Sequence, residues 1–266
     1  MKNGSVYADR VRKAYLRLAK THRKSGAVCA TDPLRQAAAA VLGRHDGLAA
    51  GMAALDRIFK RVVDWNEVRV STAEELSTWV GGLLKHPRES CEDLIRMLNG
   101  VFRRENAMSL DRLMQGKVKD ARKYLESLPG FDAYVTASVL LWSLGAHAIP
   151  VNDRLLERMK REGWVSPEAE REEVQGFLER HVKAQEAQTF AQVMESASLQ
   201  RFSGSSRSGV APAAKSAGKS KSEAKTKADG KPSSSSARSA PRVTRASKPR
   251  QAQARSKSSV RNKARK

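Results

Sequence analysis

Apolar residues recur at intervals of three and four positions along most of the chain, from about residue 5 to residue 200. This spacing places them on one face of an α-helix, and no run of strict apolar–polar alternation rich in β-branched residues indicates a strand. The pattern therefore predicts an all-α fold. The expected helices cover residues 6–24, 33–43, 47–62, 73–84, 90–104, 117–128, 134–144, 151–163, 167–182 and 184–199.

Proline and glycine mark several of the expected helix boundaries. Asp32-Pro33 and Ser166-Pro167 each combine an N-cap residue with a proline, which is favoured at the first helical position. Gly81-Gly82, Pro87 and Gly130 interrupt the helical periodicity, so we expect connections there.

The distribution of charge divides the chain at about residue 200. The protein has 266 residues, with 50 Lys and Arg against 28 Asp and Glu, and a formal net charge of +22. Residues 201–266 hold +17 of this charge and are rich in Ser, Ala, Lys, Arg, Gly and Pro. Such a segment buries too little apolar area to offset its chain entropy. We therefore predict a helical domain over residues 1–200 and a disordered basic tail over residues 201–266.

A tail of this charge is expected to bind a polyanion. It resembles the basic tails of histone H1, and counterion release favours the nonspecific binding of such segments to DNA or RNA. The alternative is that the tail only keeps the protein soluble or acts as a linker.

The sequence contains two cysteines, Cys29 and Cys91. Two thiols are too few for a disulfide framework or for a four-thiolate iron–sulfur cluster, so we expect no cofactor and no metal. The first residues are polar and charged, and the sequence has no apolar span of 18 residues. These features predict a cytoplasmic protein.

The most informative stretch runs from Tyr124 to Gly145. An amphipathic helix is predicted to end at Leu128, a tight turn follows at Pro129-Gly130, and an apolar helix begins near Ala133. Two helices joined in this way form a helix-hairpin-helix. Its turn amides and the start of its second helix bind a phosphate oxygen, which positions DNA without reading its bases.

This stretch resembles the endonuclease III-like, helix-hairpin-helix (HhH-GPD) superfamily of DNA glycosylases. The family's Leu-Pro-Gly-x-Gly hairpin aligns with Leu128 to Asp132, and its Val-Asp-Thr-His stretch aligns with Val151 to Arg154. Asp64 to Val68 and Met108 to Leu113 resemble further family segments. The resemblance therefore spans roughly residues 33–195.

The resemblance implies how the fold is divided and which residues contact DNA. The fold would have two helical lobes, a middle lobe at about residues 45–145 and a second lobe formed by residues 1–44 and 146–200. A nucleotide flipped out of double-stranded DNA would enter the cleft between them, because the glycosidic bond is inaccessible inside a stacked duplex. The expected DNA contacts of the hairpin are Leu128, Pro129, Gly130, Phe131 and Asp132.

Two departures from the family pattern concern catalysis. The catalytic lysine of bifunctional members aligns with Tyr134, and a phenol forms no Schiff base, although tyrosine also stands here in monofunctional members that use water. The essential aspartate aligns with Asn152, whose amide has neither charge nor basicity to assist base release. A one-residue adjustment would bring Asp153 into the cleft instead. Alternatively, Asn152 and Asp153 only cap the following helix.

Two further departures concern DNA binding. The second hairpin glycine is replaced by Asp132, whose carboxylate would either repel phosphate or act as the N-cap of the next helix. The glutamine that other members insert into the gap left by the flipped base aligns with His45. His45 would serve as a wedge there or would simply lie on the surface.

These observations lead to three interpretations of the function. The first is a monomeric, nucleoid-associated DNA-binding protein of the superfamily, with weakened or lost base-excision catalysis and no Schiff-base lyase activity. The second is an active monofunctional DNA glycosylase that uses Asp153. The third is an architectural DNA-binding protein that acts through its basic tail.

Overall fold

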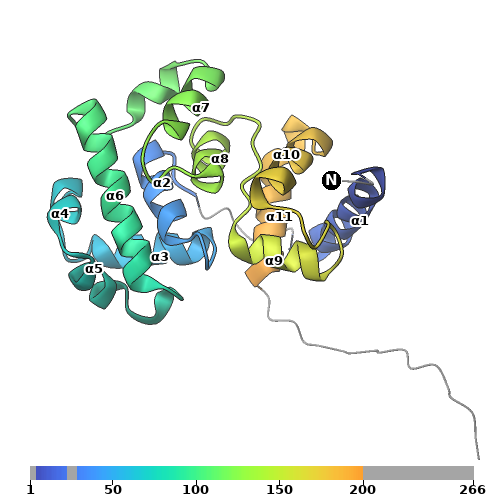
Figure 1. Cartoon of the computed structure of the whole chain (residues 1–266), viewed down its shortest axis with the longest axis horizontal. Helices are drawn as coiled ribbons and strands as arrows, with labels where there is room; N and C mark the ends of the chain where they lie inside the picture. The colour runs from blue at the N-terminus through green and yellow to red at the C-terminus, as the bar shows by residue number, and fades with distance from the viewer. Residues whose placement is uncertain (1–3, 23–28, 200–266) are drawn as a thin grey trace, which may run out of the picture. The chain divides into compact units, whose positions relative to one another are not determined.

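The computed structural model describes residues 4–22 and 29–199, and the regular elements in these residues are all helical (Figure 1). The all-α fold class is therefore confirmed, whereas the predicted basic tail lies outside the described residues. None of the described helices combines the length and the apolar character needed to cross a membrane. The α-helices are α1 (Gly4–His22), α2 (Pro33–Leu42), α3 (Leu48–Ile58), α4 (Trp65–Val70), α5 (Ala73–Val80), α6 (Pro87–Glu105), α7 (Val118–Glu126), α8 (Ala133–Trp142), α9 (Asp153–Arg161), α10 (Arg171–His181) and α11 (Ala187–Leu199).

Side-chain caps explain where several helices begin. Asp32 caps α2 by accepting a hydrogen bond from the Leu34 amide at 2.8 Å, and Pro33 occupies the first helical position as predicted. Asp64 caps α4 by accepting from the Glu67 amide at 2.9 Å. The sequence analysis missed α4 because its six residues are too few to show a helical period.

The predicted helix start at Ser166-Pro167 is wrong. These residues form a turn in which the Ala169 amide donates to the Ser166 carbonyl at 3.2 Å, and α10 begins only at Arg171. The fixed φ of proline suits the second position of a β-turn as well as the first turn of a helix. The local sequence therefore does not distinguish the two structures.

The helix α2 is the centre of a first group of helices that comprises α2 to α8. Nine of its ten residues are buried, and it packs against α3, α6 and α8. The approach of α3 is close, because a Cβ atom at Gly51 would lie 1.9 Å from the Ala39 carbonyl oxygen. The assignment of residues 33–44 to the second lobe is corrected here. A helix that is apolar on all sides needs neighbours on all sides, and only this group provides them.

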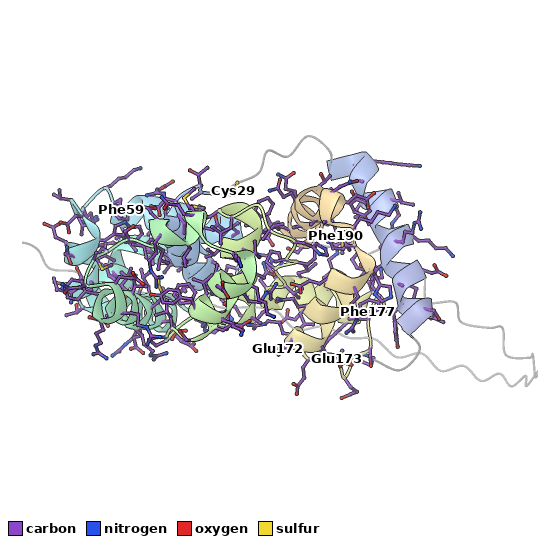
Figure 2. The ribbon with its side chains drawn as sticks, turned by 90° about the horizontal axis from the view of Figure 1, so that it is seen from above. Cys29, Phe59, Glu172, Glu173, Phe177 and Phe190 are labelled. Atoms are coloured by element: carbon purple, nitrogen blue, oxygen red, sulfur yellow. The ribbon has the colours of Figure 1, made fainter. Side chains whose placement is uncertain are left out.

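A second group consists of α1, α9, α10 and α11. The helix α11 packs against α1 and α9 and also touches α8 of the first group. Val11 and Leu18 of α1 are buried, and the ring centroids of Tyr15 and Phe190 lie 5.2 Å apart. Figure 2 shows Phe177 and Phe190 on the side of this group that faces α1. Apolar packing therefore holds α1 in place.

Candidate functional site

The turn between α7 and α8 forms the hairpin that the sequence predicts. Leu128 and Phe131 are buried, Pro129 is exposed, and the Phe131 amide donates to the Leu128 carbonyl at 3.3 Å. Gly130 has a φ of +85°, in the left-handed region that favours glycine. Asp132 has a φ of −80°, so its position does not require the glycine of the family pattern.

The hairpin rests directly on α6. A Cβ atom at Gly100 would lie 2.3 Å from Cγ of Pro129, and a Cβ atom at Gly130 would lie 2.8 Å from Cβ of Met97. Both distances are far below van der Waals contact, so glycine is needed on both sides of this junction. The shape of the turn is therefore set by α6 as well as by its own residues.

Replacement of Gly100 by alanine is expected to lower the free energy of unfolding by about 1–3 kcal/mol, because the added methyl group forces Pro129 away from α6. Gly176→Ala is the matched control. Gly176 is also helical and has nothing within 4 Å of the added Cβ, so this change should stabilise by about 0.5–1 kcal/mol. Urea denaturation measures both values. Equal stabilities of the two variants would contradict the close contact.

The hairpin presents main-chain donors that the described part of the chain does not use. The amides of Gly130, Asp132 and Ala133 form no hydrogen bond with another described residue. Ala133 lies in the first turn of α8, at the positive end of the helix dipole. Amides in such a setting bind a phosphate or carboxylate oxygen.

Asp132 acts as the N-cap of α8. Its Oδ1 accepts a hydrogen bond from the Val135 amide at 2.8 Å. Its Oδ2 forms ion pairs with Nε of Arg44 at 2.9 Å and with Nη1 of Arg171 at 3.0 Å. The two guanidinium groups offset the negative charge that this carboxylate brings to the hairpin.

A network of alternating acidic and basic side chains continues from Asp132 in both directions. On one side, Nη1 of Arg44 lies 2.5 Å from Oδ2 of Asp93 in α6. On the other side, Arg171 also pairs with Asp153 at the start of α9, and Nδ1 of His45 lies 2.5 Å from Oδ2 of Asp153. We call this set the charged network; its members are Asp93, Arg44, Asp132, Arg171, Asp153 and His45.

The charged network brings together three residues that the sequence analysis singled out, namely His45, Asp132 and Asp153. They come from the loop after α2, the hairpin and the start of α9. Arg171, which links Asp132 to Asp153, and Arg44, which pairs with Asp132, could not be singled out from the sequence. Because both oxygens of Asp153 face a basic side chain, this carboxylate is held in place rather than left free in a cleft.

Asn152 is fully buried and uses both ends of its amide within the protein. Its Oδ1 caps α9 by accepting from the Leu155 amide at 2.8 Å. The capping alternative is thus correct for Asn152 but not for Asp153, which is the first residue of the helix. Its Nδ2 donates to Oε2 of Glu195 in α11 at 2.8 Å. The other carboxylate oxygen of Glu195 accepts from the Leu48 amide at 2.7 Å. Glu195, which the sequence analysis did not identify, therefore links the starts of α3 and α9.

Tyr134 lies beside this buried carboxylate. Burial raises the pKa of the Tyr134 phenol, and the negative charge of Glu195 raises it further. Burial also raises the pKa of Glu195, against the opposing effect of its hydrogen bonds from Leu48 and Asn152. The phenol is therefore a neutral, buried group.

A cavity of about 20 Å³ adjoins Tyr134, Ser138 and Glu195, and Trp142 and Pro150 are among the residues that enclose it. The hydroxyl groups of Tyr134 and Ser138 are buried without a well-aligned hydrogen-bond partner among the described residues. A space of this size accommodates about one water molecule with several polar neighbours. It is too small to admit a nucleobase unless the surrounding helices move.

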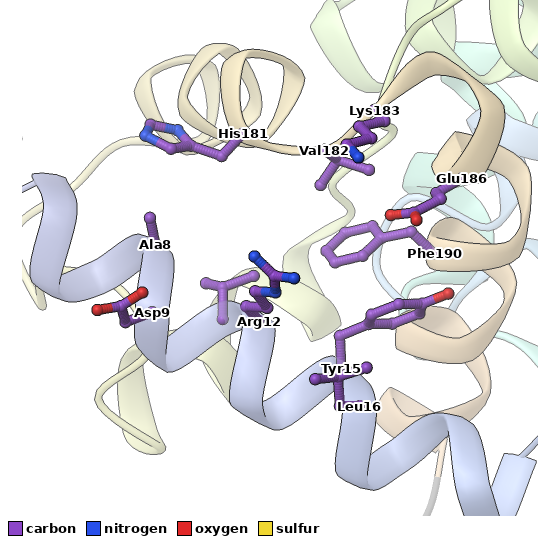
Figure 3. Close-up of a pocket in the computed structure, with 11 residues that line it drawn as sticks. Ala8, Asp9, Arg12, Tyr15, Leu16, His181, Val182, Lys183, Glu186 and Phe190 are labelled. Atoms are coloured by element: carbon purple, nitrogen blue, oxygen red, sulfur yellow. The ribbon is translucent and has the colours of Figure 1, made fainter.

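A larger pocket, with a volume of about 280 Å³, lies between α1 and the segment that joins α10 to α11 (Figure 3). Tyr15 and Phe190 form part of its wall, and Arg12 reaches from α1 toward Phe190. None of the site residues predicted from the sequence lines this pocket. It is therefore separate from the hairpin and from the charged network.

Comparisons with known proteins identify the fold. No family model and no curated protein matches the sequence. Among solved structures, a trapped endonuclease III–DNA covalent intermediate aligns with a TM-score of 0.54 and 18% identity over 70% of this chain and 84% of that chain. The Clostridium acetobutylicum 8-oxoguanine glycosylase/lyase in complex with DNA aligns with a TM-score of 0.53 and 11% identity over 74% and 70%.

The H. pylori 3-methyladenine DNA glycosylase bound to 1,N6-ethenoadenine also aligns, with a TM-score of 0.50 and 15% identity over 71% of this chain and 94% of that chain. These proteins share the helix-hairpin-helix architecture described above. The chain therefore has the fold of the endonuclease III-like DNA glycosylases, and the resemblance drawn from the hairpin sequence is confirmed at the level of the fold.

Proposed function

We propose that the protein binds double-stranded DNA through its hairpin and its basic tail and that it has lost the base-excision chemistry of the glycosylase fold. The main observation behind this proposal is that Asn152 is a buried amide whose two ends are both hydrogen-bonded, which argues against catalysis. This residue stands where the family has its essential aspartate, and both ends of its amide are engaged inside the protein. The partner is chromosomal DNA in the cytoplasm, and binding requires no cofactor.

Three observations support DNA as the partner. The amides of Gly130, Asp132 and Ala133 are available at the hairpin, where a phosphate oxygen could accept from several of them. Three of the matching solved structures are themselves complexes with DNA. The net charge of +22 adds nonspecific attraction to any polyanionic duplex.

Three observations support the loss of catalysis. Tyr134 carries no amine for a Schiff base, and its hydroxyl is buried beside a cavity of only about 20 Å³. Asp153, the other carboxylate at the start of α9, is paired with His45 and Arg171. Both oxygens of this carboxylate therefore already have partners within the protein, which leaves it poorly placed to activate water.

The test is incubation of the full chain with oligonucleotides that contain uracil, an oxidised pyrimidine, a mismatched adenine or an abasic site. We expect binding to all duplexes, no alkali-revealed base release and no borohydride-trapped adduct. Endonuclease III serves as the positive control. Base release that is lost in Asp153→Asn would instead support the monofunctional glycosylase, and a trapped adduct would contradict the role assigned to Tyr134.

A further inference from the structure

The arginines nearest the hairpin contribute little net positive charge. Arg44 faces Asp93 and Asp132, and Arg171 faces Asp132 and Asp153. Arg96 also pairs with Asp93, so three carboxylates and three guanidinium groups balance within one cluster. Charge outside this cluster, such as that of the exposed Lys119 and Lys123 in α7, is therefore needed to attract a polyanion to the helical domain.

The helix α1 has an exposed face of basic side chains. Arg10, Lys13 and Arg17 are exposed, they follow one another at intervals of three and four residues, and none forms an ion pair with a carboxylate of the described residues. Together with Ala14, Glu162, Gly163 and Trp164 they line a shallow depression of about 420 Å³, in which three cations stand against one carboxylate. We call these three side chains the α1 cationic face.

The α1 cationic face is held at a defined position. Val11 and Leu18, on the other side of the helix, are buried against the second group of helices. Nη1 of Arg10 donates to the carbonyl oxygen of Gly163 at 3.0 Å, which joins α1 to the connection after α9. The cations are therefore presented by an anchored helix, which lowers the entropy lost when they bind a partner.

Arg158 of α9 is buried and contacts Trp164, one of the residues that line this depression. The guanidinium carbon of Arg158 lies 5.8 Å from the centroid of the Trp164 ring. Burial lowers the pKa of Arg158, and the positive charges of Arg161 and Arg17 lower it further, against the opposing effect of Glu162.

The neighbouring face of α1 differs in its charge balance. It borders the pocket of Figure 3, where Asp9 and Glu186 accompany Arg12 and Lys183. Two acidic and two basic groups leave that pocket without a clear preference for an anion. The excess charge of α1 is thus confined to the side that carries Arg10, Lys13 and Arg17.

The spacing of the cations favours an extended polyanion over a small one. Arg10 and Arg17 are seven residues apart, which corresponds to about 10 Å along a helix. A duplex carries about one negative charge per 1.7 Å of its axis, so several phosphates fall within that length. A shallow, open depression also encloses too little of a small anion to hold it tightly.

We infer that the α1 cationic face is a second contact for the phosphate backbone of double-stranded DNA, separate from the hairpin. This inference rests on the proposed DNA-binding function. In this inference, Arg10, Lys13 and Arg17 attract the phosphates, whereas the arginines of the charged network are neutralised by carboxylates.

The experiment compares the full chain with its Lys13→Ala/Arg17→Ala variant by fluorescence anisotropy on an undamaged duplex over a series of KCl concentrations. Lys60→Ala/Arg61→Ala is the matched control, because these two exposed cations lie just after α3 in the first group of helices. Two lost phosphate contacts should flatten the slope of log K against log salt by about 1.8 and weaken binding several tens-fold at about 0.1 M salt. The control should bind like the unaltered chain.

A second measurement does not depend on substitution. Acylation of the full chain with and without duplex, read by mass spectrometry, should show protection of Lys13 by DNA and little protection of Lys60.

Equal labelling of Lys13 in both conditions, or an unchanged salt slope in the Lys13/Arg17 variant, would overturn the inference while leaving DNA binding itself intact. Failure of the unaltered chain to bind any duplex would instead refute the proposed function. Protection of Lys13 by anionic phosphatidylserine vesicles and not by duplex would overturn the inference in favour of a membrane contact.

Discussion

Truncation of the chain after Gln200 is expected to lower the affinity for undamaged duplex DNA by roughly two to four orders of magnitude at low salt. The change removes residues 201–266 and with them +17 of the net charge of +22. Each phosphate neutralised by Lys or Arg releases counterions, so the truncated chain should also show a much flatter dependence of affinity on KCl concentration. Fluorescence anisotropy on a labelled duplex measures both quantities.

The control for this prediction keeps the charge and changes the order of the residues. A chain in which residues 201–266 are shuffled should bind as tightly as the natural sequence, because phosphate contacts do not require a particular order of Lys and Arg. Equal affinity of the full and truncated chains would show that the tail does not take part. Loss of binding on shuffling would show that the tail reads a specific partner.

Glu195→Ala is expected to lower the free energy of unfolding by about 2–4 kcal/mol. The substitution removes the acceptor for two buried donors, the Leu48 amide and Nδ2 of Asn152, and leaves both without a partner. The substitution also removes the desolvation penalty of the buried carboxylate, and this gain offsets part of the cost. Urea denaturation provides the measurement, and Glu172→Ala on the exposed side of α10 is the control, with an expected change within about 0.5 kcal/mol.

The pH dependence of this effect tests its cause. Burial raises the pKa of Glu195 in the folded protein above the ordinary value of about 4.3, so the folded state takes up this proton at a higher pH than the unfolded state does. The stability that Glu195 contributes is therefore fully present below about pH 4.3 and is lost as the pH rises through the folded pKa. The free energy of unfolding of the unaltered protein, taken relative to that of Glu195→Gln, should therefore increase as the pH falls from 8 to 5.

Unfolding of both proteins across this pH range isolates Glu195, because the other titratable groups are common to both. A difference that grows with rising pH would contradict this account. It would show that the hydrogen bonds from Leu48 and Asn152 stabilise the anion by more than burial penalises it.

The hairpin could be predicted from the sequence because all of its determinants lie within a few residues. Leu128, Pro129 and Gly130 specify the turn, and the apolar run after Asp132 specifies a buried helix. The capping roles of Asp132 and Asn152 are equally local, since an N-cap bonds to an amide two or three residues further on. Local signals fail at Ser166-Pro167, where the sequence predicts a helix start and the structure has a turn. The fixed φ angle of proline suits both structures.

The charged network could not be predicted in the same way. His45 and Asp153 are 108 positions apart, and neither residue has a local feature that indicates the other. Arg171 was expected inside a helix that began at Pro167, and only its true place at the start of α10 explains its contact with the hairpin. Glu195 lies in an amphipathic helix, where the sequence alone does not show whether a single carboxylate faces solvent or the core.

The amino-acid sequence by itself determined the helical fold class, the hairpin turn, and the presence of a phenol at position 134 and an amide at position 152. These properties follow from residue chemistry and from contacts within a few positions. Only the tertiary structure decided that Asp132 and Asp153 are offset by arginines, that Asn152 is engaged by Glu195, and that the space beside Tyr134 is about the size of one water molecule. Those outcomes depend on side chains from distant segments, which meet only when the helices pack.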